Sequence, residues 1–488
     1  MDQISPLATA RMFLPKLPSV LKSAVYHSLW LSPTSTKWDL RTELTIAFLR
    51  SFMGGSKITP ILRQQRFTLK DSGIKGDTWV SKVTLPAPSE ADDILRLVIS
   101  AIDALKQYGG EQYTIPSLAP VEAEWTGYRS NVSASRPRPD LSEAQHYEKL
   151  MSETTSDVTI LYLHGGALFL CDPSSHRPTT TKLARLTGGR CLSLRYRLSP
   201  QVAFPAALLD VLVAYLSLLY PPPGALHDPV HASKIIISSD SAGGNLSLAL
   251  IQLLLQINRT STSSNLRFHN TTISLPIALP AGVALSSPWC DLTRSLPSII
   301  SNAQYDYLPP PLTSTAIAHF PADEVWPTNP PRGDVYCETS MMCHPLVSPL
   351  AASDWRGACP VWFGVGEEML ADEASAVASK MAKQGVKVRW EMFEAMPHCF
   401  AIVLGTCGLE ATRRFYDDWA GFCKMAVVAG EDIDTKGTIL EAKTCKEREV
   451  LVEELSPLGD EEIIRRMRAK QEERRAGTEG EAKLMPRL

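Results

Sequence analysis

A run of β-branched residues at 235–237 leads into a turn of small residues around Ser241, and a helical pattern follows. This order of strand, tight turn and helix is that of a nucleophile elbow, where the serine hydroxyl is exposed and faces the helix N-terminus. Small neighbours are needed because the two backbones nearly touch, and residues 242–244 meet that need. Ser239 replaces the first glycine of G-x-S-x-G, so we expect its CH₂OH group to add strain. The segment predicts that Ser241 is a nucleophile.

Short apolar runs alternate with helical stretches between residues 120 and 428, which is typical of βαβ units and a parallel sheet. The expected strands cover residues 124–129, 158–163, 190–196, 234–239, 283–287, 361–365 and 386–393. The predicted fold class is therefore α/β, with a mostly parallel central sheet flanked by helices. We place this domain at residues 119–429 and interpret the Ser-, Thr- and Asn-rich segment 259–275 as a surface insertion.

The regions on either side of this domain differ from it in residue composition and pattern. Residues 1–118 carry helical patterns, notably at 18–30 and 38–53, broken by Pro, Gly and Ser. We predict that they form a helical region that contributes a cap. Residues 430–488 lose their aromatic side chains and become dense in Glu, Lys and Arg. This composition predicts a charged C-terminal tail that is helical or disordered.

Composition excludes several classes of function. The chain is 44% hydrophobic and 21% charged, and its net charge of −3 gives no reason to expect nucleic acid or an anionic membrane as a partner. Its ten cysteines form no C-x-x-C pair or His-Cys cluster at zinc spacing, so we expect no metal site and a reducing compartment. We find no secretory signal pattern and no apolar run near about 20 residues, which predicts a cytoplasmic protein without a membrane span. Surface association of the N-terminal helices and the oligomeric state stay open.

A serine nucleophile also needs donors for the oxyanion that forms on the substrate. Residues 164–167 read His-Gly-Gly-Ala directly after an expected strand. Consecutive glycines let backbone N–H groups turn toward a substrate without a side chain in the way. We therefore predict that the N–H groups of Gly165 and Gly166 join that of Ala242, the residue after the nucleophile, in an oxyanion hole.

The base and the acid of a catalytic triad are expected after Ser241 in the chain, in the order acid and then histidine. His398 follows the last expected strand of the domain, and no later histidine exists. The acid is less defined, because the loop after 361–365 carries four carboxylates. Spacing alone leaves Glu367, Glu368 and Asp372 open as the group that orients His398.

Together these motifs resemble the hormone-sensitive-lipase-like family of α/β-hydrolases, and the resemblance covers residues 120–425. The family's Y-R-L-A-P-E, S-P-W and D-P-L-x-D-E segments are matched at residues 196–200, 287–289 and 368–373. The resemblance implies an α/β-hydrolase fold with an N-terminal cap and places the acid at Glu368. It also implies that His164, Asp240 and Gly243, which belong to the same motifs, support the site. The residue pattern of the N-terminal region is similar to that of fungal members, including steryl acetyl hydrolases and esterases of secondary metabolism.

The predicted activity is hydrolysis of an uncharged small-molecule ester with a short acyl group on an apolar alcohol, which needs no metal or cofactor. Two alternatives stay open. The first is an acyltransferase, or a cyclising or dehydrating pathway enzyme, that uses the same site. The second is a non-catalytic ligand receptor on the same fold, although the presence of His398 argues against it. The acyl chain length, the alcohol and the pathway are not defined by the sequence.

Overall fold

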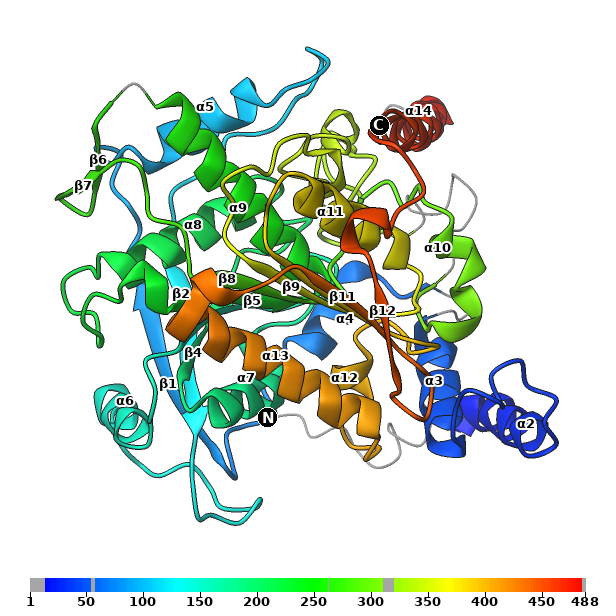
Figure 1. The fold of residues 1–488 in the computed structure, drawn as a ribbon. Coiled ribbons are helices and arrows are strands. Elements are labelled where there is room, and N and C mark those ends of the chain that lie inside the picture. The colour runs from blue at the N-terminus through cyan, green and yellow to red at the C-terminus, as the bar shows by residue number, and fades with distance from the viewer. Residues whose placement is uncertain (1–13, 54–57, 262, 310–319, 485–488) are drawn as a thin grey trace.

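A ten-stranded sheet forms the centre of the molecule (Figure 1). The structure is a computed structural model and describes residues 14–53, 58–261, 263–309 and 320–484. The strands follow the order β1-β2-β4-β3-β5-β8-β9-β10-β11-β12, and the pairs from β4 to β11 are parallel. Their bounds are β1 Thr78–Leu85, β2 Val121–Tyr128, β3 Thr159–Leu163, β4 Arg190–Arg195, β5 Ile235–Asp240, β8 Gly282–Ser286, β9 Val361–Gly366, β10 Val388–Phe393, β11 Lys436–Leu440 and β12 Glu447–Val450. The predicted fold class and all seven predicted strands are confirmed.

Helices cover both faces of this sheet. Those of the domain are α5 Ile94–Ala104, α6 Glu143–Ser152, α7 Pro173–Thr187, α8 Ala206–Leu219, α9 Ala242–Thr260, α10 Ser298–Ser301, α11 Ala371–Lys383, α12 Phe400–Val403, α13 Glu410–Ala429 and α14 Asp460–Leu484. Helices α7 and α13 pack together on one face, and α5, α8, α9 and α11 pack on the other. Alternate residues of a strand serve the two cores, since Ile160 and Tyr162 belong to one and Leu161 and Leu163 to the other.

The predicted boundaries of the flanking regions are partly wrong. Strand β1 lies within residues 1–118 but pairs with β2 over eight residues, and α5 packs on α9, so both belong to the central domain. The C-terminal region is not only helical or disordered, because β11 pairs with β10 and β12 with β11 before α14 begins. The segment predicted as an insertion forms a hairpin of β6 (Asn265–Phe268) and β7 (Thr271–Ser274), which pair only with each other in the described chain.

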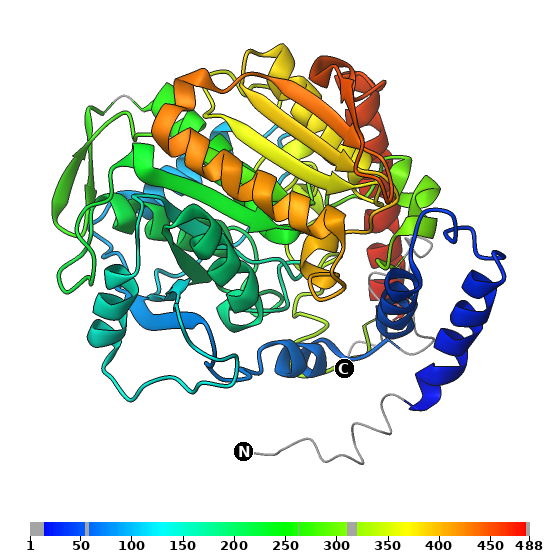
Figure 2. The same cartoon turned by 60° about the horizontal axis from the view of Figure 1, so that its bottom comes forward.

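The described residues before β1 form α2 Leu17–Ser28, α3 Leu40–Met53 and α4 Ile61–Thr68. Helix α3 contacts the central domain, whereas α2 lies at the outer edge of the molecule beside α3 (Figure 2). Across the described residues, we find no helix with the length and apolar character needed to span a membrane.

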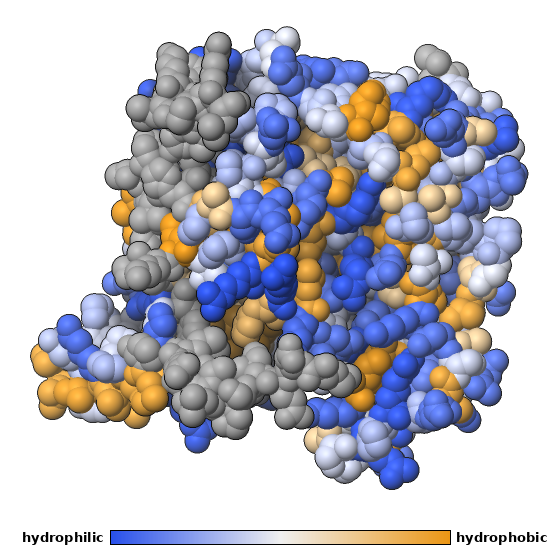
Figure 3. All heavy atoms as spheres, turned by 180° about the vertical axis from the view of Figure 1, so that it is seen from behind, coloured by the Kyte–Doolittle hydropathy of each residue, from blue (hydrophilic) through white to orange (hydrophobic). Residues whose placement is uncertain are grey.

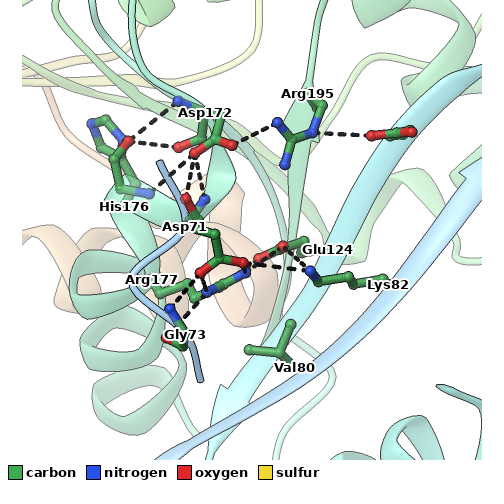
Figure 4. A network of polar contacts seen from close by, with 12 residues as sticks. Asp71, Gly73, Val80, Lys82, Glu124, Asp172, His176, Arg177 and Arg195 are labelled. Carbon is green, nitrogen blue, oxygen red and sulfur yellow. Dashed lines mark hydrogen bonds and ion pairs between the residues drawn. The ribbon is translucent and has the colours of Figure 1, made fainter. Parts of the chain in front are cut away.

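A buried ion-pair network fixes the N-terminal segment and α7 to the sheet (Figure 4). The guanidinium of Arg177 donates to Glu124 on β2 at 2.6 and 2.8 Å and to Asp71 of the N-terminal segment at 2.6 and 2.9 Å. Asp172 caps α7, and its second carboxylate oxygen pairs with Arg195 on β4 at 2.6 Å. The first turn of α7 is thus held from both sides, which fixes His176 inside the fold.

Candidate active site

Ser241 occupies a strained turn between β5 and α9, as a nucleophile elbow requires. Its backbone angles are φ 50° and ψ −119°, in a region that non-glycine residues rarely adopt. The strand and helix approach so closely that a Cβ on Gly243 would lie 1.9 Å from the Leu163 carbonyl oxygen. Ser239 is accommodated as an ordinary buried strand residue, and its hydroxyl accepts a hydrogen bond from Ser247 at 2.8 Å. The strain is therefore concentrated at Ser241.

Three side chains from separate loops meet at this turn. The Nε2 atom of His398 lies 2.9 Å from the Ser241 hydroxyl, and its Nδ1 atom lies 2.5 Å from Oε2 of Glu368. Ser241, Glu368 and His398 follow β5, β9 and β10, whose carboxyl ends meet at one edge of the parallel sheet. Glu368 and His398 are 0% and 3% exposed, so solvent screens their interaction little.

The electrostatics of this pair favour a charged imidazole. Burial by itself lowers the pKa of His398, but the neighbouring Cys399 and Glu368 outweigh burial and raise it well above its ordinary value. Burial raises the pKa of the Cys399 thiol to about 11, so Glu368 is the charge that acts on His398 near neutral pH. Burial also raises the pKa of Glu368, and His398 opposes this shift. The carboxylate is therefore placed to stabilise an imidazolium.

The other carboxylates of the acid loop point elsewhere. Glu367 accepts a hydrogen bond from the Ala395 N–H at 2.9 Å, and Asp372 accepts one from the Ser298 N–H at 2.9 Å. Glu373 accepts the N–H groups of Cys290 and Asp291. Of the candidates that spacing left open, only Glu368 contacts His398 in the described chain.

The loop after β3 differs from the predicted oxyanion hole at one position. The Gly165 N–H donates to Oδ1 of Asp240 at 3.1 Å, so it is not available to a substrate, and its predicted role is wrong. Within the residues that the structure describes, the N–H groups of Gly166, Ala167 and Ala242 have no acceptor. Ala167 holds φ at 53°, where an alanine costs about 1–2 kcal/mol relative to glycine.

Asp240 lies directly before Ser241, and its buried carboxylate contacts several parts of the site. Besides the Gly165 N–H, it accepts the Tyr162 hydroxyl at 2.7 Å and lies 3.3 Å from Nε2 of His176. Burial opposes charge on both groups, yet their mutual attraction lowers the pKa of Asp240 and raises that of His176. A Cβ on Gly165 would lie 2.2 Å from the Asp240 carboxylate, so only glycine fits at this position.

His164 supports the loop in the neutral form. Burial and the nearby His176 lower its pKa to about 4, and its Nδ1 atom lies 2.7 Å from the Gly165 carbonyl oxygen. The ring stacks on Tyr196 with centroids 4.3 Å apart, and the Tyr196 hydroxyl donates to the His164 carbonyl oxygen at 2.7 Å. Tyr196 was found in the sequence only as part of a family segment.

Sequence reasoning missed Asp306, which joins the loops that carry Glu368 and His398. Its carboxylate accepts the Met369 N–H at 2.8 Å and the His398 N–H at 3.4 Å. The residue lies in an irregular segment with no motif around it, so no local signal could have identified it. Among the described residues, no group of three or more His, Cys, Asp or Glu side chains could hold a metal ion.

Comparison with known proteins agrees with this geometry. Residues 160–402 match the family model described as alpha/beta hydrolase fold. An "Acetyl-hydrolase" of Streptomyces hygroscopicus is 32% identical over 49% of this chain and 67% of its own length. An "Esterase" of Acinetobacter venetianus is 29% identical over 51% of this chain and 69% of its own length. The chain therefore belongs to the hormone-sensitive-lipase-like family of α/β-hydrolases, a family of ester-hydrolysing enzymes.

The same fold occurs in a solved structure described as an esterase from the bacterial hormone-sensitive lipase family. It has 20% sequence identity and a TM-score of 0.50, and the match covers 80% of this chain and 99% of that one.

Proposed function

We propose that this protein is a serine carboxylester hydrolase in which Ser241 is the nucleophile, His398 the general base and Glu368 the acid that orients it. The observation that carries the proposal is the pair of contacts made by the His398 ring, 2.9 Å to the Ser241 hydroxyl and 2.5 Å to Glu368. This is the arrangement that activates a serine hydroxyl and stabilises the imidazolium that forms.

The reaction begins when Oγ of Ser241 attacks the ester carbonyl carbon and His398 takes the hydroxyl proton at Nε2. The C=O π electrons move onto oxygen, and the tetrahedral intermediate then collapses as the alcohol leaves with the proton from His398. A water molecule attacks the acyl-enzyme, and His398 again takes and returns a proton. The carboxylic acid departs, and Ser241 regains its hydroxyl.

The oxyanion is proposed to bind the N–H groups of Gly166, Ala167 and Ala242. These groups have no acceptor within the described chain, and they flank Ser241 from the β3 loop and from the start of α9. Gly165 takes a positioning role instead, because its N–H ties the loop to Asp240 at 3.1 Å. Loss of one oxyanion donor typically lowers kcat by about 10²- to 10³-fold.

The proposed substrate is an uncharged ester with a short acyl group and an apolar alcohol, such as a sterol or a secondary metabolite. The name "Acetyl-hydrolase" of the Streptomyces hygroscopicus relative supports a short acyl group. The net charge of −3 supplies no strong field that would draw an ionic substrate.

We also propose that the part of the N-terminal region before β1 contributes the cap. Helix α4 lies on the loop that follows β3, because Gln65 donates to the Phe169 carbonyl oxygen at 2.9 Å and Thr68 accepts the Cys171 N–H at 3.2 Å. On the other side, Arg50 of α3 donates to the Asp306 carbonyl oxygen at 2.8 Å. Helix α4 thus contacts the loop after β3, and α3 contacts Asp306, which binds the loops of Glu368 and His398.

Labelling with a fluorophosphonate, followed by peptide mapping, tests the nucleophile. We expect wild type and the exposed control Ser301→Ala to be labelled at residue 241 and to hydrolyse p-nitrophenyl acetate and butyrate. Ser241→Ala should lose the label and at least about 10³-fold in kcat. Labelled and active Ser241→Ala protein would refute the assignment. A series of acyl lengths, with and without an added alcohol, then separates hydrolysis from acyl transfer.

A further inference from the structure

Helix α2 exposes far more apolar surface than a helix of a folded domain normally does. None of its residues is buried, although the helix and its flanks are rich in large apolar side chains. The exposed fractions reach 62% for Leu21, 55% for Val25 and 69% for Trp30. The other exposed large apolar residues of this segment are Leu14, Leu17, Tyr26, Leu29 and Leu31. Contiguous apolar surface of this kind marks an interaction site.

The exposed side chains form one stripe. Leu17, Leu21, Val25 and Leu29 recur at intervals of four, so they lie on one side of the helix. The opposite side, which includes Val20, Ala24 and His27, is half-buried and faces α3. In the view from behind, apolar side chains gather on the projecting part of the molecule at the lower left (Figure 3). No described residue covers the stripe. We call these four residues the α2 stripe.

Helix α2 is held firmly in this position. The buried carboxylate of Glu43 on α3 accepts the Thr34 hydroxyl at 2.6 Å and lies 3.2 Å from Nδ1 of His27. Helix α3 is fixed in turn to the catalytic domain, where Trp38 just before it donates to the Ala395 carbonyl oxygen at 2.6 Å. The exposure of the α2 stripe is therefore built into the fold.

The charge of this segment differs from that of the whole chain. Residues 14–38 contain no Asp or Glu, whereas three lysines lie within them. Lys37 pairs with Glu394 at 2.8 Å, and Lys16 donates to the Ser51 carbonyl oxygen. Lys22 is exposed beside the stripe and lies 5.3 Å from the centroid of the Tyr26 ring. Tyr26 and Trp30 are the aromatic types that favour the boundary between hydrocarbon and water. An apolar stripe with an adjacent lysine, interfacial aromatics and no carboxylate among residues 14–38 matches an anionic lipid surface.

We propose that α2 docks this enzyme on an anionic lipid surface, with the α2 stripe in the acyl region and Lys22 at the headgroups. A convex helical face without a groove beside it suits a lipid surface, which adapts its shape to the helix. A second copy fits less well, because Lys22 lies near the middle of α2 and antiparallel pairing about that point would bring two lysines together. The proposal goes beyond ester hydrolysis and does not depend on the triad.

Helix α2 is linked to the candidate site through α3 and the residue just before α3. Trp38 contacts Ala395, three residues before His398, and Arg50 of α3 contacts Asp306, which accepts the His398 N–H. The helix that touches the lipid is thus linked through α3 to the loop that carries the base. Docking on lipid would therefore hold the enzyme at the surface in which an apolar ester dissolves.

Vesicle flotation of the full-length protein tests the proposal. We expect wild type to float with vesicles of phosphatidylcholine and phosphatidylserine, and to float less with phosphatidylcholine alone. The double variant Leu21→Ser with Val25→Ser should lose about tenfold or more in binding, since it removes exposed apolar surface only. Lys22→Glu should lose binding to the anionic vesicles. The matched control Val428→Ser changes a residue that is 82% exposed on α13 and should bind as wild type does.

Two further measurements separate a loss of lipid binding from misfolding and from a loss of catalysis. Hydrolysis of p-nitrophenyl butyrate in solution should be unchanged in the double variant, which shows that it is folded. Ser241→Ala should float like wild type, because docking does not use the nucleophile. Absence of wild-type flotation, or equal flotation of the double variant, would overturn the proposal. A wild-type dimer that becomes a monomer in the double variant, seen by analytical ultracentrifugation, would show instead that the stripe joins two copies.

Discussion

Replacement of Glu368 by Gln isolates what the buried carboxylate does for His398. The amide is nearly isosteric and can still occupy the position 2.5 Å from Nδ1, but it carries no charge. A hydrogen bond to a charged group contributes about 1.5–3 kcal/mol. Since one pKa unit corresponds to about 1.36 kcal/mol, the substitution should lower the pKa of His398 by about one to two units.

The direction in which the pH profile shifts follows from the protonation state that His398 needs as a base. A general base accepts a proton only when it is neutral, so kcat/KM rises with pH through the pKa of His398 in the free enzyme. Glu368 raises that pKa against the effect of burial. In Glu368→Gln, the acid limb of the profile should therefore move about one to two units to lower pH. The plateau of kcat should fall by roughly 10³- to 10⁴-fold, because the developing imidazolium is no longer stabilised.

The assay is p-nitrophenyl butyrate hydrolysis across the pH range, with kcat and KM determined at each pH. Glu367→Gln is the matched control, since its carboxylate binds the Ala395 N–H and does not contact His398. The control should keep the wild-type acid limb. The reasoning fails if Glu368→Gln retains the wild-type plateau or if its acid limb moves to higher pH.

Two predictions concern stability and are measured by urea unfolding. Gly243→Ala should lose about 3 kcal/mol or more, because its Cβ would lie 1.9 Å from a backbone oxygen of β3. Its control, Gly421→Ala in α13, has no atom within 4 Å of the new Cβ and should gain up to about 1 kcal/mol. Arg177→Leu should lose about 3–5 kcal/mol, because it leaves the buried Glu124 without its partner. Arg413→Leu, which breaks exposed pairs on α13, should change stability by less than about 1 kcal/mol. Equal losses within either pair would contradict the corresponding argument.

The strands of the central domain could be predicted because burial on both faces gives each a short apolar or β-branched run. Strand β1 was missed, since Ser81, Lys82 and Thr84 interrupt its apolar residues and it lies at the edge of the sheet. Strands β11 and β12 were missed for a related reason. They are four or five residues long, and β12 reads Glu-Arg-Glu-Val, a sequence that is also typical of a solvated tail. Short strands with several polar residues carry too little apolar pattern to be found alone.

The candidate site could be predicted where chain order constrains it. Ser241 and His398 follow from the order of motifs, and Glu368 followed only from the family resemblance. The direction of the Gly165 N–H could not be predicted, because it is set by Asp240, which lies 75 residues further along the chain. Likewise, Asp306 enters the site through a loop without regular structure. Sequence patterns report local geometry, whereas these contacts join segments that only the folded chain brings together.

The position of Asp240 explains how one side chain can align several parts of the site. It is adjacent to Ser241, and its carboxylate also holds the loop after β3 through Gly165 and the start of α7 through His176. A buried charge is stable only with a partner. Asp240 raises the pKa of His176 against the effect of burial, and His176 lowers the pKa of Asp240, so each group favours the charged form of the other. His164 stacks nearby on the His176 ring but stays neutral, since its pKa is about 4. The Asp240 carboxylate therefore joins the turn at Ser241 to the loop after β3 and to the start of α7, and its bond to the Gly165 N–H fixes how that loop lies relative to Ser241.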